Sequence, residues 1–473
     1  MTMPKSPAVD ATLAAGVWKV VAVAVLGSFI TNLDGTIVNV SLASLSTELG
    51  ATLSTIQWVT SGYLLALTIV LPINGWLVDR IGAKALYIWC FCAFTLTSSL
   101  CGLAWSAPSL IGFRILQGFA GGLMAPMAQM MIARAAGPQM ARVAGLAATP
   151  ILLAPLLGPI IAGTILQYAS WRWLFLVNVP VGAVGVGLAL AFLPDDREER
   201  RARELDVLGL ALLSPALALF LYSTDHLSEP LGLGLLGLSV LLLGAFIWNA
   251  HRKGEGALID LRQFRSRLFT VASLAQFLSN GTTFAGQMLI PVYLVSAAGR
   301  SPAEVGVLLL PMGIGMLCTF PSMGVLTRLL GTRGVAAGGS LLSVLATATL
   351  AYQSTGPLNV VVFSLALFLR GAGLGGVGIP SITTAYASVS RRDLPMATTT
   401  LNVVQRLGGP TLTTLVATFL TWQLTLAPSA ASTSGPNAYT WAFVLLCALH
   451  LATFLAALAF PRRAELPEKE KSA

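Results

Sequence analysis

Residues 53–84 read LSTIQWVTSGYLLALTIVLPINGWLVDRIGAK and join a long apolar run to a short charged segment. Residues 53–74 contain no Asp, Glu, Lys or Arg, whereas Asp79, Arg80 and Lys84 follow closely and a second apolar run begins there. A helix needs about 20 mostly apolar residues to cross the hydrocarbon core of a bilayer. The stretch therefore predicts two membrane-spanning helices joined by a short charged loop.

The same alternation of apolar runs and short polar loops continues along the chain. It predicts an all-α membrane protein with fourteen transmembrane helices, at residues 17–40, 53–74, 84–104, 108–131, 141–167, 173–193, 207–224, 231–250, 268–297, 304–327, 335–353, 358–386, 397–425 and 438–460. The first run is too long for the apolar part of a cleaved signal peptide, so we expect it to remain as the first span.

The composition excludes an ordinary soluble protein. Hydrophobic residues make up 55% of the 473 residues and charged residues only 10%, whereas soluble domains carry about 25% charged residues. The net charge of +9 could indicate a nucleic-acid partner. However, arginine and lysine concentrate in the loops that follow even-numbered spans, as the positive-inside rule requires. We therefore expect no nucleic-acid partner, a location in the cell (inner) membrane, and both termini in the cytoplasm.

Two halves of the chain repeat the same features in the same order. Asp34-Gly35-Thr36 is echoed by Asn280-Gly281-Thr282, and Arg114 is echoed by Arg370. Repeated halves that rock about a central site are the physical basis of alternating access. We expect two six-helix bundles (1–193 and 268–461), two inserted helices with their linkers (194–267), a cytoplasmic tail (462–473), and a monomer, since one chain contains both halves.

Several segments resemble the major facilitator superfamily, and in particular its fourteen-span drug:proton antiporter branch, the EmrB/QacA type. The resemblance rests on LDGTIVNV (33–40), GWLVDRIGAK (75–84), RILQG (114–118), APLLGPIIAG (154–163) and WRWLF (171–175). It covers nearly the whole chain. It implies the major facilitator fold and secondary active export, with protons as the coupling ion and no cofactor.

Asp34 is the main candidate for proton coupling. It is the only carboxylate well inside the fourteen predicted spans, and a charge at that depth is costly enough to require a protein interior or water around it. The resemblance implies that Arg114 in the fourth span assists release of the proton. The alternative is a structural acid that is paired with Arg114, and the two interpretations are compatible because a breakable pair is also a switch.

The remaining candidate residues form three groups. The resemblance implies a cytoplasmic gate that involves Gly75, Asp79, Arg80 and Gly82, and a pliable antiporter motif that involves Pro155, Gly158, Pro159 and Gly163. Polar and aromatic residues within the spans are candidates for substrate binding or, equally, for helix packing: Thr31, Asn32, Asn39, Gln57, Trp58, Tyr63, Gln117, Asn280, Gln287, Tyr293, Asn402 and Gln405.

The function that we expect is proton-coupled export of small amphipathic or drug-like compounds. Because only one buried carboxylate is available, the expected substrates are monovalent cations, zwitterions or neutral compounds. A dedicated carrier, for export or uptake of one metabolite, lipid or siderophore-like molecule, is the alternative. An enzyme, a metal site and ATP drive are not expected, because the sequence has no catalytic cluster, no ligand cluster and no phosphate-binding loop. Whether an envelope-spanning adaptor takes part is left open.

Overall fold

The computed structural model describes residues 15–196, 204–227, 229–426 and 437–461, and every regular element within them is a helix. Eleven segments in this part of the chain are long and apolar enough to cross a membrane. The expected spans 268–297 and 397–425 form the long helices α11 (Arg267–Ser296) and α14 (Leu394–Leu426), which are not among the eleven. Both helices carry many Ser, Thr, Asn and Gln residues, which lower their hydropathy.

Two helices contain breaks that the sequence explains. The expected spans 304–327 and 335–353 form a single element, α12 (Pro302–Gln353), which is interrupted by Gly331 with φ 71° and ψ 166°. The second expected span forms α2 (Leu53–Val70), a 3₁₀ turn at Leu71–Ile73 that contains Pro72, and α3 (Asn74–Ile81). Proline removes one backbone hydrogen bond and therefore favours such an interruption.

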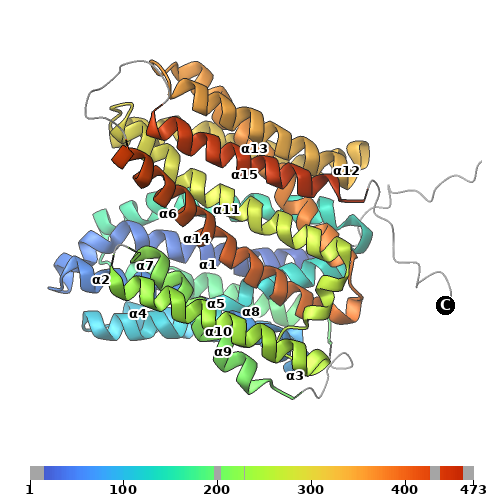
Figure 1. Cartoon of the computed structure of the whole chain (residues 1–473). Coiled ribbons are helices and arrows are strands. Elements are labelled where there is room, and N and C mark those ends of the chain that lie inside the picture. The colour runs from blue at the N-terminus through green and yellow to red at the C-terminus, as the bar shows by residue number, and fades with distance from the viewer. Residues whose placement is uncertain (1–14, 197–203, 228, 427–436, 462–473) are drawn as a thin grey trace, which may run out of the picture.

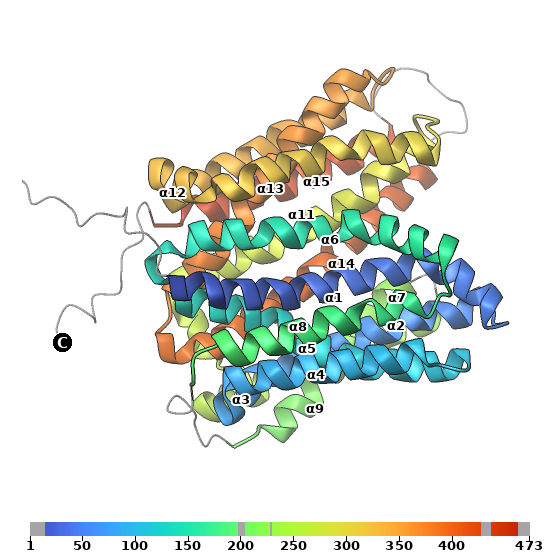
Figure 2. The same cartoon turned by 180° about the vertical axis from the view of Figure 1, so that it is seen from behind.

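The N-terminal helices pack chiefly against one another. This group consists of α1 (Ala15–Glu48), α2, α3, α4 (Ala83–Gly102), α5 (Ala107–Ala136), α6 (Met140–Tyr168), α7 (Trp173–Leu176) and α8 (Asn178–Phe192). Helix α1 contacts α2, α5, α6 and α8, and α5 also packs against α2 and α4. Figures 1 and 2 show these blue-to-green helices together in one half of the molecule.

The C-terminal helices form the other half in the same views. Helix α11 contacts α13 (Val360–Ala387), α14 and α15 (Ala438–Leu458), while α12 packs along α13 and α15. Between the two groups in sequence, α9 (Val207–Asp225) and α10 (Pro230–Lys253) pair with each other, and α9 also touches α2 and α14. The Ser214 hydroxyl of α9 donates a hydrogen bond of 2.7 Å to the Ile69 carbonyl of α2. Helix α9 is therefore attached to the side of the molecule where the two groups meet.

The two halves contact each other closely toward one end. Asn74 Nδ2 donates to Thr399 Oγ1 of α14 at 3.4 Å, and Asn402 Nδ2 of α14 donates to Gln129 Oε1 of α5 at 3.1 Å. Helix α6 packs against α12, where Gly145 lies directly against the Phe320 backbone. Because glycine has no side chain, the two helices approach closely there.

Candidate functional site

A buried ion pair joins α1 to α5. Arg114 Nη1 donates to Asp34 Oδ2 at 2.5 Å, and neither side chain has any exposed surface. Moving both charges out of water costs several kcal/mol per ion in real proteins, so a stable pair needs further hydrogen bonds around it. The structure therefore places the two residues in contact, as the sequence-based alternative of a paired acid described.

Amide side chains complete the shell of the Asp34 carboxylate. Asn178 Nδ2 donates to Oδ1 at 2.7 Å, and Gln117 Nε2 donates to the same oxygen at 3.3 Å. Gln117 Oε1 in turn accepts from Arg114 Nη1 at 2.8 Å, and Asn178 also donates to Ser98 Oγ at 3.0 Å. The network around the carboxylate thus joins residues from four helices, α1, α4, α5 and α8.

Arg114 is enclosed by backbone and aromatic rings. Its Nε donates to the Val59 carbonyl at 3.2 Å, and its guanidinium carbon lies 4.1 Å from the centroid of the Tyr63 ring. The Phe175 ring lies on another side at 5.8 Å. The remaining terminal nitrogen, Nη2, is buried and has no hydrogen-bond partner within the described residues. The cation is thus held by one carboxylate, one carbonyl, one amide and the faces of two rings.

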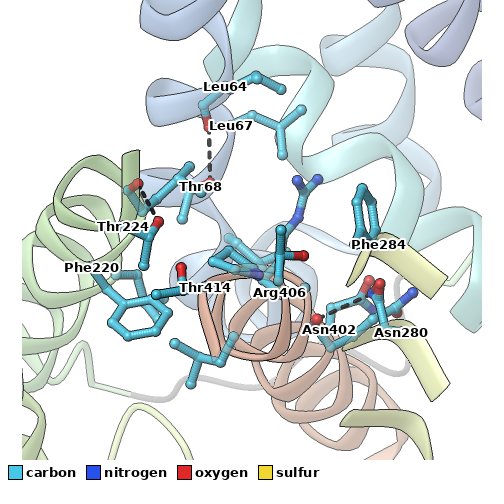
Figure 3. A pocket seen from close by; sticks show the side chains of 18 of the residues that line it. Leu64, Leu67, Thr68, Phe220, Thr224, Asn280, Phe284, Asn402, Arg406 and Thr414 are labelled. Carbon is cyan, nitrogen blue, oxygen red and sulfur yellow. Dashed lines mark hydrogen bonds between the residues drawn. The ribbon is translucent and has the colours of Figure 1, made fainter. Parts of the chain in front are cut away.

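A cavity of about 1270 Å³ lies next to this pair, and its lining comes from α1, α2, α5, α9, α11 and α14 together with Leu71, Leu227 and Leu233. The lining mixes leucine and phenylalanine side chains with many hydroxyl and amide groups (Figure 3). Along α14 it extends from Asn402 to Thr425, near the end of that helix. A cavity of this size and mixed polarity suits an amphipathic small molecule.

Tyr63 separates the cavity from the ion pair. It belongs to the cavity lining, whereas Asp34 and Arg114 do not, although Thr31, Gly35 and Thr36 on the same helix as Asp34 do. One face of its ring covers the Arg114 guanidinium. The carboxylate and the cavity are therefore neighbours that share a wall and are not one continuous site.

Seven of the residues that the sequence suggested for substrate binding line the cavity: Thr31, Asn32, Asn39, Tyr63, Asn280, Asn402 and Gln405. Gln117 belongs to the Asp34 network. Gln57, Trp58, Gln287 and Tyr293 lie outside this lining: the first three are exposed, with Trp58 near Tyr222, and Tyr293 is buried in an aromatic cluster with Phe363 and Phe443. Residue type alone could not separate these two groups, because the direction in which a side chain points depends on helix rotation and packing.

The sequence reasoning missed Arg406 of α14, which also lines the cavity. Figure 3 shows its guanidinium in the open space between Leu67 and Phe284. The available signal was its position, since Arg406 is the only charged residue within the expected span 397–425.

The residues of the expected gate lie where the halves meet. A side chain on Gly75 would be 3.2–3.4 Å from Thr399, Pro395 and Met396 of α14, and Asp79 is buried. Gly82 has φ 93° and forms the turn between α3 and α4, a conformation that glycine adopts without strain. Arg80 is exposed. Among the gate residues, Gly75 thus lies beside the start of α14.

The residues of the expected antiporter motif lie on α6, which packs along α1. Gly158 is buried against Thr36, whereas Gly163 has open space beside it and Pro159 is exposed. The side chain of Pro155 lies outside the described residues. Only Gly158 among these positions therefore brings α6 into close contact with the cavity-lining helix α1.

The fold and the cavity together define a multi-pass helical membrane transporter. Residues 24–412 match the model of the Major Facilitator Superfamily. The chain therefore belongs to this superfamily, and it is a transporter and not an enzyme.

Similar proteins agree with this assignment. The Multidrug resistance protein B homolog of Mycobacterium tuberculosis (strain ATCC 25618 / H37Rv) is 32% identical over 421 residues, which cover 86% of this chain and 77% of that protein. The Putative multidrug resistance protein MdtD of Serratia proteamaculans (strain 568) is 32% identical over 306 residues, 63% of each chain. The structure of the proton:xylose symporter XylE matches 97% of this chain with a TM-score of 0.65 and 15% identity, which supports the fold.

Proposed function

We propose that this protein is a proton-coupled antiporter that exports small amphipathic or drug-like compounds by alternating access. The observation that carries the proposal is the buried Asp34–Arg114 pair beside a cavity that lies between the two halves. The similarity to chains named as multidrug resistance proteins supports drug-like substrates.

The proposed role of Asp34 is to bind and release the coupling proton. A carboxylate at the centre of a spanning helix costs roughly 2.5–3.5 kcal/mol on insertion scales, and a group of this kind is typically retained for function. Protonation of Asp34 would remove the charge that Arg114 binds and would leave Arg114 to find another acceptor. Since Tyr63 covers Arg114 and also lines the cavity, such a rearrangement would reach the cavity without direct competition between proton and substrate.

Alternating access would use the contacts between the halves as a gate. The contacts of α14 with α3 and α5, and of α6 with α12, lie toward one end, while the cavity lining reaches Thr425 toward the other end. With both termini in the cytoplasm, as the charge distribution predicts, the closed end would face the cytoplasm. The structure would then correspond to an outward-facing state.

The finer features of the topology are part of the same proposal. They are fourteen spans in the cell (inner) membrane, arranged as six-helix bundles at 1–193 and 268–461 with two helices inserted within 194–267, and a functional monomer without a cofactor. Proteolysis or labelling of single added sites in the loops, from either side of sealed vesicles, would test the topology directly.

The test of proton coupling is proton release on substrate addition by the purified protein in detergent. The panel contains a monocationic dye, a neutral dye and an aromatic carboxylate of similar size. We expect substrate addition to release protons from the wild type but not from Asp34→Asn. The control is Glu229→Gln, which removes an exposed carboxylate at the start of α10 and should release protons as the wild type does. Substrate binding without proton release, or release that Asp34→Asn leaves unchanged, would refute proton coupling at Asp34.

A further inference from the structure

The cavity contains one charged side chain in its lining, Arg406 of α14. The lining has no Asp or Glu, and no hydrogen bond or ion pair to Arg406 is present among the described residues. The residue is exposed to the cavity, and its guanidinium extends into the open space (Figure 3). Arginine keeps its charge under all ordinary conditions, so the cavity carries a positive charge at this point.

The nearby carboxylate does not neutralise Arg406. Asp34 is saturated by Arg114, Gln117 and Asn178, and it lies behind Tyr63, outside the lining. A cation that enters the cavity therefore meets a like charge and no acidic partner, which disfavours its binding. An anion meets an uncompensated donor in a region of low dielectric, where a charge-assisted hydrogen bond is strong.

The surroundings of Arg406 suit an anion with an apolar body. The side chains of Leu67 and Phe284 lie on either side of the guanidinium (Figure 3), and together with other leucines of the lining they offer a surface for rings or alkyl chains. The guanidinium presents parallel N–H groups that match the two oxygens of a carboxylate or sulfonate. The Asn32 and Asn39 amides and the threonine hydroxyls of α14 supply further polar contacts.

We propose that the transported substrates are amphipathic monoanions, and that Arg406 binds their carboxylate or sulfonate group. This inference rests on the proposed function, because it names the substrate class of the same cavity. It changes the substrate class that the sequence led us to expect. Monovalent cations are no longer expected substrates, whereas zwitterions are, because Arg406 can bind their anionic group. Arg406 is thus a specificity-determining residue that contacts the substrate.

Three compounds with the same ring system test this assignment: 2-naphthoate, methyl 2-naphthoate and 2-naphthylmethylammonium. Binding to the full chain in lipid nanodiscs is measured by calorimetry at neutral pH, without a proton gradient. We expect the wild type to bind naphthoate at least ten times more tightly than the ester, and the ammonium compound most weakly. Arg406→Gln should lose this preference but bind the ester as before, and Arg406→Lys should keep part of it.

The matched control is Arg391→Gln, which removes an exposed arginine just before the same helix and should leave all three affinities unchanged. The proposal would be overturned if the wild type bound the ammonium compound most tightly. It would also be overturned if Arg406→Gln left the ratio of the naphthoate and ester affinities unchanged. The latter result would mean that Arg406 serves an internal ion pair in another conformation. If Arg406→Gln cannot be purified in a folded state, two other results test the proposal. They are the order of the three affinities in the wild type and the ratio of the naphthoate and ester affinities in Arg406→Lys.

The outcome is separable from that of the proposed function. Naphthoate binding that depends on Arg406, combined with no proton release and no proton-driven flux, would refute antiport and retain the anion site. Proton-driven flux of cationic dyes that is insensitive to Arg406→Gln would retain antiport and refute the anion site.

Discussion

The Arg114 guanidinium lies 4.1 Å from the centroid of the Tyr63 ring, and the same tyrosine lines the cavity. A buried cation over an aromatic face gains about 2 kcal/mol or more when both are desolvated. The ring therefore stabilises Arg114 and also forms the wall between the cavity and the Asp34 carboxylate. A movement of Arg114 away from Asp34 would therefore change its contact with this ring.

Replacement of the ring should open the path between the cavity and Asp34. We expect Tyr63→Leu to raise proton leakage through reconstituted protein in the absence of substrate by about tenfold, because the side chain no longer covers Arg114. Tyr63→Phe should stay near wild type, since the buried Tyr63 hydroxyl has no hydrogen-bond partner among the described residues. A pH-sensitive dye inside the vesicles reports the proton leak. Equal leakage in Tyr63→Leu and Tyr63→Phe would contradict the claim that the Tyr63 ring separates the cavity from the ion pair.

The ion pair should show strong coupling between its partners. Removal of one member of a buried pair costs about 3–5 kcal/mol, because the other charge is left without compensation. We expect Asp34→Asn and Arg114→Gln each to lower the unfolding temperature clearly, and the double variant to lose much less than the sum. Thermal unfolding in detergent gives the three values. Additive losses would show that the pair contributes little beyond its separate contacts.

Gly145 should control the balance between conformations. A β-carbon at this position would overlap with the Phe320 carbonyl and lie 2.8 Å from Met323 Cβ, both in α12. Gly145→Ala should therefore separate α6 from α12 and favour the opposite state of the transporter. Thr399→Cys in a cysteine-free background, at the same closed end, should then react several times faster with a thiol reagent.

The control for this prediction lies on the same helix. Gly163 has no atom within 4 Å of the corresponding β-carbon position, so Gly163→Ala should leave the reaction rate of Thr399→Cys unchanged. A similar increase in both variants would indicate a general loosening of α6 and would contradict a specific role for Gly145.

Asp206, at the start of α9, should make stability depend on pH in the acid range. Burial raises the pKa of its carboxyl, but hydrogen bonds from Lys253, Gly209 and Leu258 outweigh burial and lower the pKa below its ordinary value. A lowered pKa in the folded state contributes stability that is present above the unfolded value, about 3.9, and is lost as pH falls through the lowered value. Asp206→Asn should reduce stability at neutral pH and flatten this acid dependence in thermal unfolding. If stability fell equally steeply with decreasing pH in the wild type and in Asp206→Asn, other carboxylates would be the cause of the acid dependence.

Some features of the site could be predicted from residue identity alone. A carboxylate at position 34 and an arginine at position 114, each inside an apolar run, require partners because hydrocarbon offers none. Their pairing was one of the alternatives that the sequence allowed, and the structure places them in contact. The residue type at position 82 also favoured a turn, because Gly82 has φ 93° and glycine adopts this conformation without strain.

Other features depended on packing. The sequence could not tell that Tyr63 lines the cavity and that Tyr293 is buried among aromatic rings, because both are aromatic residues within apolar runs. The sequence also could not predict that α9 forms part of the cavity wall. Its lining residues Leu217, Phe220 and Leu221 indicated only an apolar membrane span.

The sequence by itself determined that this protein is a helical membrane protein of the major facilitator type, because the length of each apolar run, the charges between runs and the local motifs are properties of single segments. Only the tertiary structure decided that Asp34 faces Arg114 behind Tyr63 while Arg406 faces the cavity. The physical reason is that the rotation of a helix about its own axis depends on the side chains of its neighbours. Those neighbours come from segments tens to hundreds of residues away in the chain.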